Sequence, residues 1–285
     1  MSSRTGRKRL QARKPFGESG PLVSRIGQGT WPVPDPGALR HGIELGLTHI
    51  DTAEMYGDGK SEEFVGKAIR GIARDSLFLV SKVLPQNAHT RGVADACDRS
   101  LRRLGTEYLD CYLLHWRGNV PIGETMAALE KLVDSGKARS IGVSNLDPWD
   151  LREAAGTLNT HKIACDQVLY NLDERTIEDH ELPWVHEYGC ALVAYTPLGQ
   201  PVLDPDGKKF AVVAGIARKY GVTPHAVVLS YLTRDPSVFA IPKASRLPHV
   251  DANAAALTLD LSESDVAAIS AAHPNRERVG PLPTN

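Results

Sequence analysis

The chain contains few cysteines and no long hydrophobic run, and both absences exclude whole classes of protein. Four of its 285 residues are cysteines, widely spaced and without a CxxC pair: Cys97, Cys111, Cys165 and Cys190. The sequence therefore predicts neither a disulfide framework nor a zinc knuckle, and a reducing cytoplasm is the expected location. No apolar run approaches the length of a membrane span, and we expect no secretion signal at the start.

An excess of one charge sign is also missing. The formal net charge is −1, although the first 14 residues carry six basic side chains and no acid. A basic arm can bind nucleic acid. Terminal segments are more often solvated and partly disordered, and the rest of the chain has no basic surplus. We therefore predict a basic extension over residues 1–20, and neither nucleic acid nor membrane as a partner.

A glycine-rich dinucleotide turn is absent too. The nearest match, Gly27-Gln28-Gly29, lacks the third glycine of the G-x-G-x-x-G pattern and precedes Trp31-Pro32, a poor helix start. A doubly wound nucleotide-binding sheet normally carries that pattern, so its absence disfavours this fold.

What the sequence does contain is a regular alternation of short apolar runs and helical patterns. Strands are expected at 26–30, 45–51, 78–82, 108–115, 140–145, 163–167, 190–195 and 238–241. Helices are expected at 36–45, 61–71, 91–104, 122–135, 148–155, 177–188, 208–220, 224–233, 248–256 and 262–272. Eight strands, each followed by helical sequence, predict an α/β fold of the (β/α)8 TIM-barrel type. We expect one domain over 21–272, a C-terminal tail over 273–285, and the N-terminal extension capping the barrel bottom.

Four chemically active side chains stand at or just beyond the ends of three successive predicted strands: Asp51, Tyr56, Lys82 and His115. The carboxyl ends of parallel strands share one face, so these residues can converge there. A phenol keeps its proton at neutral pH, and a neighbouring ammonium lowers its pKa. An aspartate keeps a buried lysine charged, and a neutral imidazole can orient a substrate oxygen.

This set suits a carbonyl that receives a hydride and must be protonated as negative charge builds on its oxygen. Tyr56 is the expected proton donor, Lys82 its tuner, Asp51 the partner of Lys82, and His115 the carbonyl orienter. Each residue alone has a common structural explanation, such as a helix cap or a core aromatic. Four of them at matching strand ends make that explanation much weaker.

Seven motifs follow one another along the chain: DTAEMYGDG (51–59), LFLVSK (77–82), LRRLGTEYLDCYLLHW (101–116), IGVSN (141–145), DQVLYN (166–171), AYTPLG (194–199) and IPKAS (241–245). By these motifs the sequence resembles the aldo-keto reductase superfamily from about Gly27 to Ile269. This resemblance implies a (β/α)8 barrel that reduces aldehydes or ketones with NADPH, with the four residues above as its catalytic tetrad.

The resemblance also implies cofactor-binding residues, each at a position matching the family pattern. The nicotinamide carboxamide is expected at Ser144, Asn145 and Gln167, the nicotinamide ring on Tyr195, the pyrophosphate along Thr196, Leu198 and Gly199, the 2′-phosphate at Lys243, and adenine at Asn253.

One departure concerns the 2′-phosphate. Many relatives place an arginine six residues after the lysine, where this chain has His249. Ser245 and Arg246 are candidates to compensate. NADPH is therefore the expected cofactor, with NADH as a second possibility.

The substrate pocket is expected to be apolar and aromatic, with Trp31, Met55 and Trp116 lining its mouth. The short tail after Ala272 favours an open pocket for small aldehydes. The motifs are most similar to bacterial members of the methylglyoxal or 2,5-diketo-gluconate reductase type, which suggests 2-oxoaldehydes such as methylglyoxal or sugar-derived carbonyls. A monomer is expected.

Two other functions fit parts of the sequence. The same superfamily includes potassium-channel auxiliary subunits, which keep the barrel and cofactor but act through a partner, so a catalytically weak regulatory subunit is the first alternative. A metal-dependent hydrolase using Asp51 and His115 as ligands is the second, although it would be expected to show an HxH or HExxH motif, which the sequence lacks.

Overall fold

The protein is a closed parallel barrel, as the alternation predicts. The computed structural model describes residues 11–32, 35–199 and 208–284, and within these ranges an eight-stranded sheet runs in the order β10-β9-β8-β7-β6-β5-β4-β3. A parallel bridge between Ile26 and Ala240 joins the two sheet edges and closes the ring. The strands are β3 (Gln28–Gly29), β4 (His49–Asp51), β5 (Phe78–Val83), β6 (Cys111–Leu114), β7 (Ile141–Ser144), β8 (Ile163–Leu169), β9 (Ala191–Tyr195) and β10 (Val238–Ala240).

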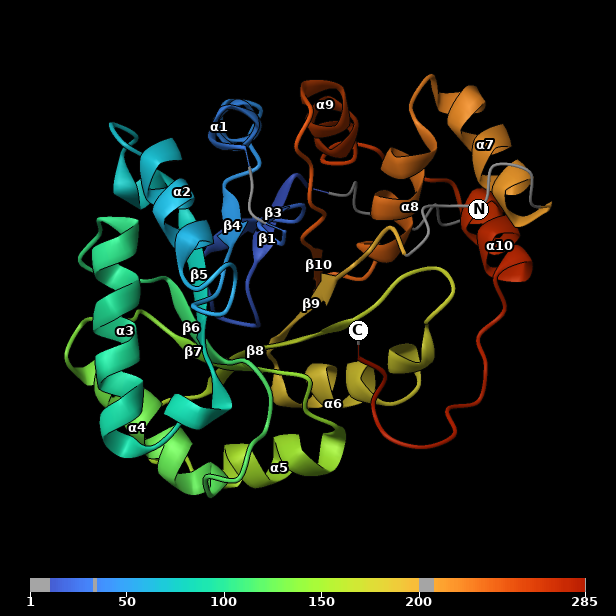
Figure 1. Cartoon of the computed structure of the whole chain (residues 1–285). Coiled ribbons are helices and arrows are strands. Elements are labelled where there is room, and N and C mark those ends of the chain that lie inside the picture. The colour runs from blue at the N-terminus through green and yellow to red at the C-terminus, as the bar shows by residue number, and fades with distance from the viewer. Residues whose placement is uncertain (1–10, 33–34, 200–207, 285) are drawn as a thin grey trace, which may run out of the picture.

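Helices surround this ring on the outside (Figure 1). They are α1 (Pro36–Glu44), α2 (Lys60–Ala68), α3 (Thr90–Leu104), α4 (Ile122–Asp134), α5 (Pro148–Gly156), α6 (Glu181–Tyr188), α7 (Lys208–Tyr220), α8 (Pro224–Leu232), α9 (Leu247–Ala255) and α10 (Glu263–Ala272). The described part of the chain also contains the 3-10 turns η1 (Arg74–Ser76), η2 (Pro85–Asn87) and η3 (Thr176–Glu178). The (β/α)8 TIM-barrel prediction is confirmed.

Local capping explains where several helices begin. The side chain of Asp35 accepts a hydrogen bond from the Ala38 amide, with Pro36 at the first helical position of α1, as predicted. The prediction that Ser61 starts the next helix is wrong, because α2 begins one residue earlier behind Gly59, whose φ is 85°. The helix expected over 177–188 is interrupted, with η3 ending before α6 begins.

The core has two layers, inside the barrel and between barrel and helices. Side chains on a strand alternate between the faces of the sheet. In β6, Cys111 and Leu113 belong to one packed cluster, while Tyr112 and Leu114 belong to the other. The smaller cluster fills the barrel interior, so the centre is packed and not a pore.

A hairpin of β1 (Arg13–Pro15) and β2 (Leu22–Ser24) covers the amino end of the barrel. Phe16 of this hairpin packs against Phe78 and Phe239, with ring centroids 4.7 and 5.0 Å apart. The expected cap at the barrel bottom is therefore present, although the pairing of two strands was not predicted.

Lys14, expected on a solvated arm, is in fact buried. Its ammonium donates hydrogen bonds to the carbonyls of Thr233, Asp235 and Val238. Burial, with a contribution from the charge of Arg25, lowers the pKa of Lys14 to about 7. Residues 1–10, which hold the remainder of the basic segment, lie outside the described ranges.

The C-terminal tail returns to the barrel wall. Arg278 donates a hydrogen bond of 2.6 Å to the fully buried carboxylate of Glu181 in α6. In the parts of the chain that the structure describes, no helix is long and apolar enough to cross a membrane.

Candidate active site

Parallel pairing brings the predicted polar residues to one edge of the barrel. Asp51 is the last residue of β4, Lys82 is the penultimate residue of β5, and His115 follows the end of β6. The register pairs Asp51 with Val80 and Lys82 with Leu113. Because adjacent parallel strands end on the same face, these side chains lie at the carboxyl edge of the sheet.

Lys82 is the centre of the cluster. Its Nζ donates hydrogen bonds to Asp51 Oδ1 at 2.5 Å, to the Thr52 carbonyl at 3.0 Å and to Tyr56 OH at 3.3 Å. The exposed fractions of the Lys82 and Asp51 side chains are 0% and 1%. An ammonium has three donors, so this buried lysine is fully paired.

Two opposing effects act on these groups. Burial alone lowers the pKa of Lys82, but the charge of Asp51 and the hydrogen bonds raise it above its ordinary value. For Tyr56, burial raises the pKa, and the lowering by Lys82 does not offset it. The lowering effect expected from Lys82 is present, but burial outweighs it, so the pKa of Tyr56 is raised. The phenol therefore carries its proton at neutral pH.

His115 lies beside this pair as a neutral imidazole. Its ring stands edge-on to that of Tyr56, with centroids 5.7 Å apart at 76°. Burial, followed by the charge of Lys82, lowers the pKa of His115 to about 3. Its Nδ1 is buried and has no hydrogen-bond partner among the described residues, so this atom cannot reach an external oxygen. The neutral imidazole has a second ring nitrogen, Nε2, and the ring can hold an external oxygen through that atom.

The residues expected to hold the nicotinamide are connected to this cluster. Gln167 Nε2 donates to the second carboxylate oxygen of Asp51 at 2.7 Å. Ser144 Oγ donates to the Gln167 carbonyl at 2.7 Å, and Asn145 Nδ2 to the His115 carbonyl at 3.2 Å. Tyr195 OH donates to Asn145 Oδ1 at 2.8 Å. Gln167 in β8 and Asn145 after β7 thus bond directly to the cluster, and Tyr195 at the end of β9 is joined to it through Asn145.

The same edge holds the described non-glycine residues with positive φ: Asp58 (54°), Asn145 (59°) and Thr196 (49°). This conformation is costly for a β-branched residue such as Thr196. Such backbone strain gathers at ligand-binding sites, and two of these residues are among those expected to bind cofactor. Gly199 closes a turn by donating its amide to the Thr196 carbonyl at 3.0 Å, and Leu198 lies within that turn.

The residues expected around the adenosine form a second group, beyond β10. Lys243 is partly buried, whereas Ser245 and His249 are exposed. Arg246 Nη2 lies 2.9 Å from His249 Nε2, so an arginine is present beside the histidine that departs from the family pattern. Asn253 is buried in α9.

Aromatic side chains flank the cluster, as expected. The Trp31 ring lies 5.4 Å from that of Tyr56, and the Trp116 ring 4.8 Å from that of His115. Trp31 is 56% exposed and Trp116 is 37% exposed. Met55 is partly buried in the loop that holds Tyr56. Exposed large hydrophobic groups beside a polar cluster are typical of a ligand site.

Supporting hydroxyl groups were missed by the sequence analysis. Thr30 Oγ1 donates to the Asp51 carbonyl at 2.9 Å, and Ser61 Oγ donates to Thr30 Oγ1 at 2.8 Å. These residues stand at or near the ends of predicted elements, which was the only available signal. They hold the end of β4 in place.

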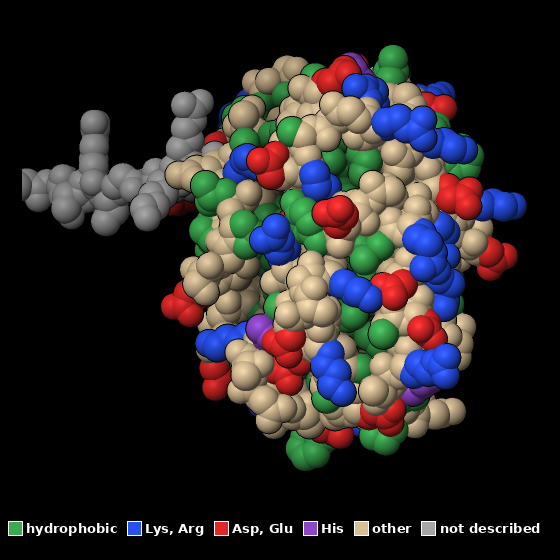
Figure 2. All heavy atoms as spheres, turned by 90° about the vertical axis from the view of Figure 1, so that its left-hand side faces the viewer, with side chains coloured by type: hydrophobic (Ala, Val, Ile, Leu, Met, Phe, Trp, Pro, Cys, Tyr) green, Lys and Arg blue, Asp and Glu red, His purple; other side chains and the backbone are tan. Residues whose placement is uncertain are grey.

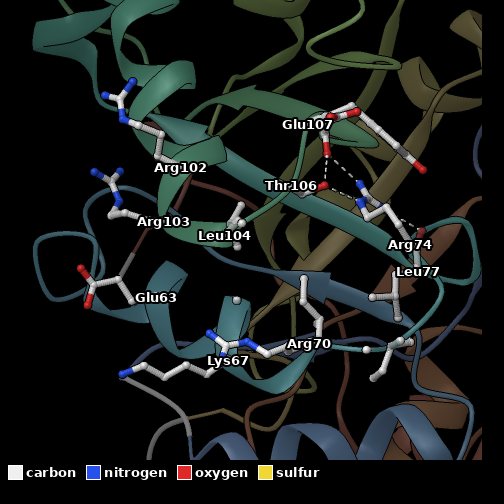
Figure 3. Close-up of a pocket in the computed structure, with 16 residues that line it drawn as sticks. Glu63, Lys67, Arg70, Arg74, Leu77, Arg102, Arg103, Leu104, Thr106 and Glu107 are labelled. Carbon is white, nitrogen blue, oxygen red and sulfur yellow. Dashed lines mark hydrogen bonds between the residues drawn. The ribbon is translucent and has the colours of Figure 1, made fainter.

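A separate cavity of about 820 Å³ lies between α2 and α3 and includes none of the residues predicted for the site. Cationic side chains border it from both sides, Lys67 and Arg70 on one and Arg102 and Arg103 on the other (Figure 3). Arg74 is engaged with Asp110 and Thr106. On the face that carries these helices, acidic and basic side chains are interspersed (Figure 2).

Metal chemistry gains no support from the described ranges, where no group of three or more His, Cys, Asp or Glu side chains is placed to hold a metal ion. Asp51, proposed as a ligand in the hydrolase alternative, instead pairs with Lys82 and Gln167.

Comparison with known proteins gives consistent matches along the chain. A family model described as the aldo/keto reductase family matches residues 25–274. The methylglyoxal reductase YeaE of Escherichia coli is 45% identical over 258 residues, covering 87% of this chain and 90% of the relative. The glyoxal reductase of Bacillus subtilis is 34% identical over 251 residues, covering 86% of each.

A solved structure is also similar. The crystal structure of an aldo/keto reductase from Klebsiella pneumoniae, in complex with NADP and acetate, has a TM-score of 0.90 and 43% sequence identity. The match covers 97% of this chain and 100% of that one.

Proposed function

Because the chain belongs to the aldo/keto reductase family, we propose that it is an NADPH-dependent enzyme that reduces small aldehydes and ketones, with Tyr56 as the proton donor. The carbonyl-reducing activity follows from the family. The hydrogen-bonded chain Asp51–Lys82–Tyr56 is the observation that carries the proposed chemistry.

The residues at the carboxyl edge fit a nicotinamide cofactor. Ser144, Asn145 and Gln167 offer amide and hydroxyl groups for a carboxamide, and Tyr195 is a partly exposed aromatic for a ring. NADP is present in the Klebsiella structure. We assign Thr196, Leu198 and Gly199 to the pyrophosphate and Asn253 to adenine.

Lys243 is assigned to the 2′-phosphate, together with Arg246, Ser245 and His249. Cations next to a dianionic phosphate favour NADPH over NADH. The contact between Arg246 and His249 supports this preference, since it places a guanidinium where the family arginine is missing.

When bound, NADPH supplies the hydride for the carbonyl carbon. The protein supplies the proton and the alignment. His115 holds the carbonyl oxygen as a neutral hydrogen-bonding group, and Tyr56 OH donates its proton to that oxygen as negative charge develops there. Lys82 stabilises the resulting phenolate, and Asp51 keeps Lys82 charged.

For the substrate, we propose 2-oxoaldehydes such as methylglyoxal, with sugar-derived carbonyls as a second class. The relatives named above act on methylglyoxal and glyoxal. The exposed rings of Trp31 and Trp116 and the partly buried Met55 in the loop that holds Tyr56 support an apolar mouth for small molecules. We further propose that the enzyme is a cytoplasmic monomer, and the burial of all four cysteines as free thiols suits a reducing compartment.

The test follows the absorbance of reduced nicotinamide with NADPH or NADH and with methylglyoxal, a ketose or an aromatic aldehyde. The proposal expects oxidation of NADPH with methylglyoxal, faster than with NADH. Tight cofactor binding without turnover on any carbonyl would instead favour the regulatory-subunit alternative.

A further inference from the structure

Glu54, for which the sequence analysis predicted no role, is a nearly buried carboxylate two residues before Tyr56. Its side chain is 6% exposed. Oε1 accepts hydrogen bonds from the Leu84 amide at 2.8 Å and from Asn87 Nδ2 at 2.9 Å. Oε2 accepts from Arg99 Nη2 at 3.2 Å. The carboxylate is therefore engaged on both oxygens.

These bonds connect the loop that carries Tyr56 to the segment that follows Lys82. The Glu54 amide donates to the Lys82 carbonyl at 3.3 Å, so backbone and side chain of Glu54 hold the chain on either side of Val83. The Tyr56 amide in turn donates to the Ala53 carbonyl at 3.1 Å. The turn that places the phenol is thus attached to the end of β5.

The three hydrogen bonds of the Lys82 ammonium depend on different parts of the fold. Asp51 is the last residue of β4 and Thr52 directly follows it, so strand pairing positions both acceptors. Tyr56 stands four residues further on in a loop, and its bond of 3.3 Å is the longest of the three. The phenol is therefore the partner whose position strand pairing does not determine.

We propose that Glu54 is a positioning residue that holds Tyr56 OH in line with Lys82 for proton donation, an inference that rests on the proposed reductase function. Its contribution is geometric. Arg99 balances its charge, and Asp51 balances that of Lys82. Misplacement of a reacting group by about 1 Å can cost roughly 100-fold in rate.

Three substitutions separate geometry from charge. Glu54→Gln removes the charge but keeps an oxygen for the Leu84 and Asn87 donors, so kcat should stay near the wild-type value. Glu54→Asp keeps the charge but withdraws the carboxylate by one methylene, so kcat should fall. Glu54→Ala should lower kcat by roughly 10- to 100-fold.

Arg99→Ala is the matched control, because it removes the ion pair at Oε2 and leaves both Oε1 bonds. It should leave kcat unchanged. For all four variants the dissociation constant of NADPH and the shape of the pH profile should match wild type, because neither the cofactor residues nor the proton donor itself is altered.

Amide hydrogen exchange gives a readout independent of turnover. The Leu84 and Glu54 amides should lose protection in Glu54→Ala and Glu54→Asp and keep it in Glu54→Gln. If Glu54→Ala fails to fold, the comparison of Glu54→Asp with Glu54→Gln still shows whether Glu54 acts through the position of its carboxylate.

Wild-type kcat in Glu54→Asp and Glu54→Ala overturns the inference, as does an equal loss in Glu54→Gln. A wild-type protein that reduces no carbonyl overturns the proposed function instead. In that case unchanged exchange at Leu84 in Glu54→Asp would separately refute the anchoring role of Glu54.

Discussion

Removal of Asp51 tests the buried ion pair on which the site depends. In Asp51→Ala, Lys82 keeps two acceptors, the Thr52 carbonyl and Tyr56 OH, but loses its counter-ion at 0% exposure. Breaking a buried pair by removing one partner costs about 3–5 kcal/mol, because the other charge stays buried. Each kcal/mol of lost stability lowers the midpoint temperature of thermal unfolding by roughly 2–4 °C in a large domain. We therefore expect the midpoint temperature of Asp51→Ala to be roughly 6–20 °C below that of the wild-type protein.

The stability lost in Asp51→Ala should become smaller as the pH rises. In the wild-type protein the pKa of Lys82 is raised by its partner, so its stabilising contribution is present below the unfolded value of about 10.4 and is lost as pH rises through the folded value. In Asp51→Ala, burial without a partner lowers that pKa, so the variant gains stability as pH rises toward about 10.4. The difference between the two proteins should therefore narrow at high pH.

The assay is thermal or urea unfolding of the cofactor-free protein, compared among wild type, Asp51→Ala, Lys82→Met and the double variant. Replacing both charges removes the unpaired ion, so the double variant should be more stable than Asp51→Ala alone. The reasoning would be refuted if the stability losses of the two single variants simply added in the double variant, or if the double variant were less stable than Asp51→Ala.

Two further predictions concern other parts of the chain. Lys243→Ala should weaken binding of NADPH more than of NADH, measured by fluorescence titration, because only NADPH carries the 2′-phosphate; equal losses would place that phosphate elsewhere. His49 is fully buried among Phe16, Phe78 and Phe239, and burial with the charge of Lys82 lowers its pKa to about 3. The unfolded chain then binds the proton more readily below about pH 6.5, so stability should fall by about 1.4 kcal/mol per pH unit between there and about pH 3. His49→Leu should reduce the acid slope of the unfolding free energy by this amount, and an unchanged slope would contradict the assignment.

Much of the framework is predictable from the sequence because its signals are local. The outer helices have apolar residues at helical spacing, and most observed bounds lie within a few residues of those expected. The convergence of Asp51, Lys82 and His115 is predictable because residues at the ends of consecutive parallel strands must share one edge. No long-range contact has to be known for that argument.

What could not be predicted depends on non-local contacts. The β1–β2 hairpin has strands of three residues each, too short for a visible alternation. In the sequence Lys14 belongs to a run of basic residues, and its burial depends on three backbone carbonyls in and just before β10 that accept its hydrogen bonds. The net rise of the Tyr56 pKa depends on burial, and the role of Glu54 on donors about 30 or more residues away.

The most direct test of the central claim is the Tyr56→Phe variant, studied by steady-state reduction of methylglyoxal and by NADPH titration. Loss of a positioned general acid typically costs about 100- to 10,000-fold in rate, so kcat/KM should fall by that amount while the NADPH dissociation constant stays the same. Turnover close to wild type would contradict the assignment of Tyr56 as the proton donor.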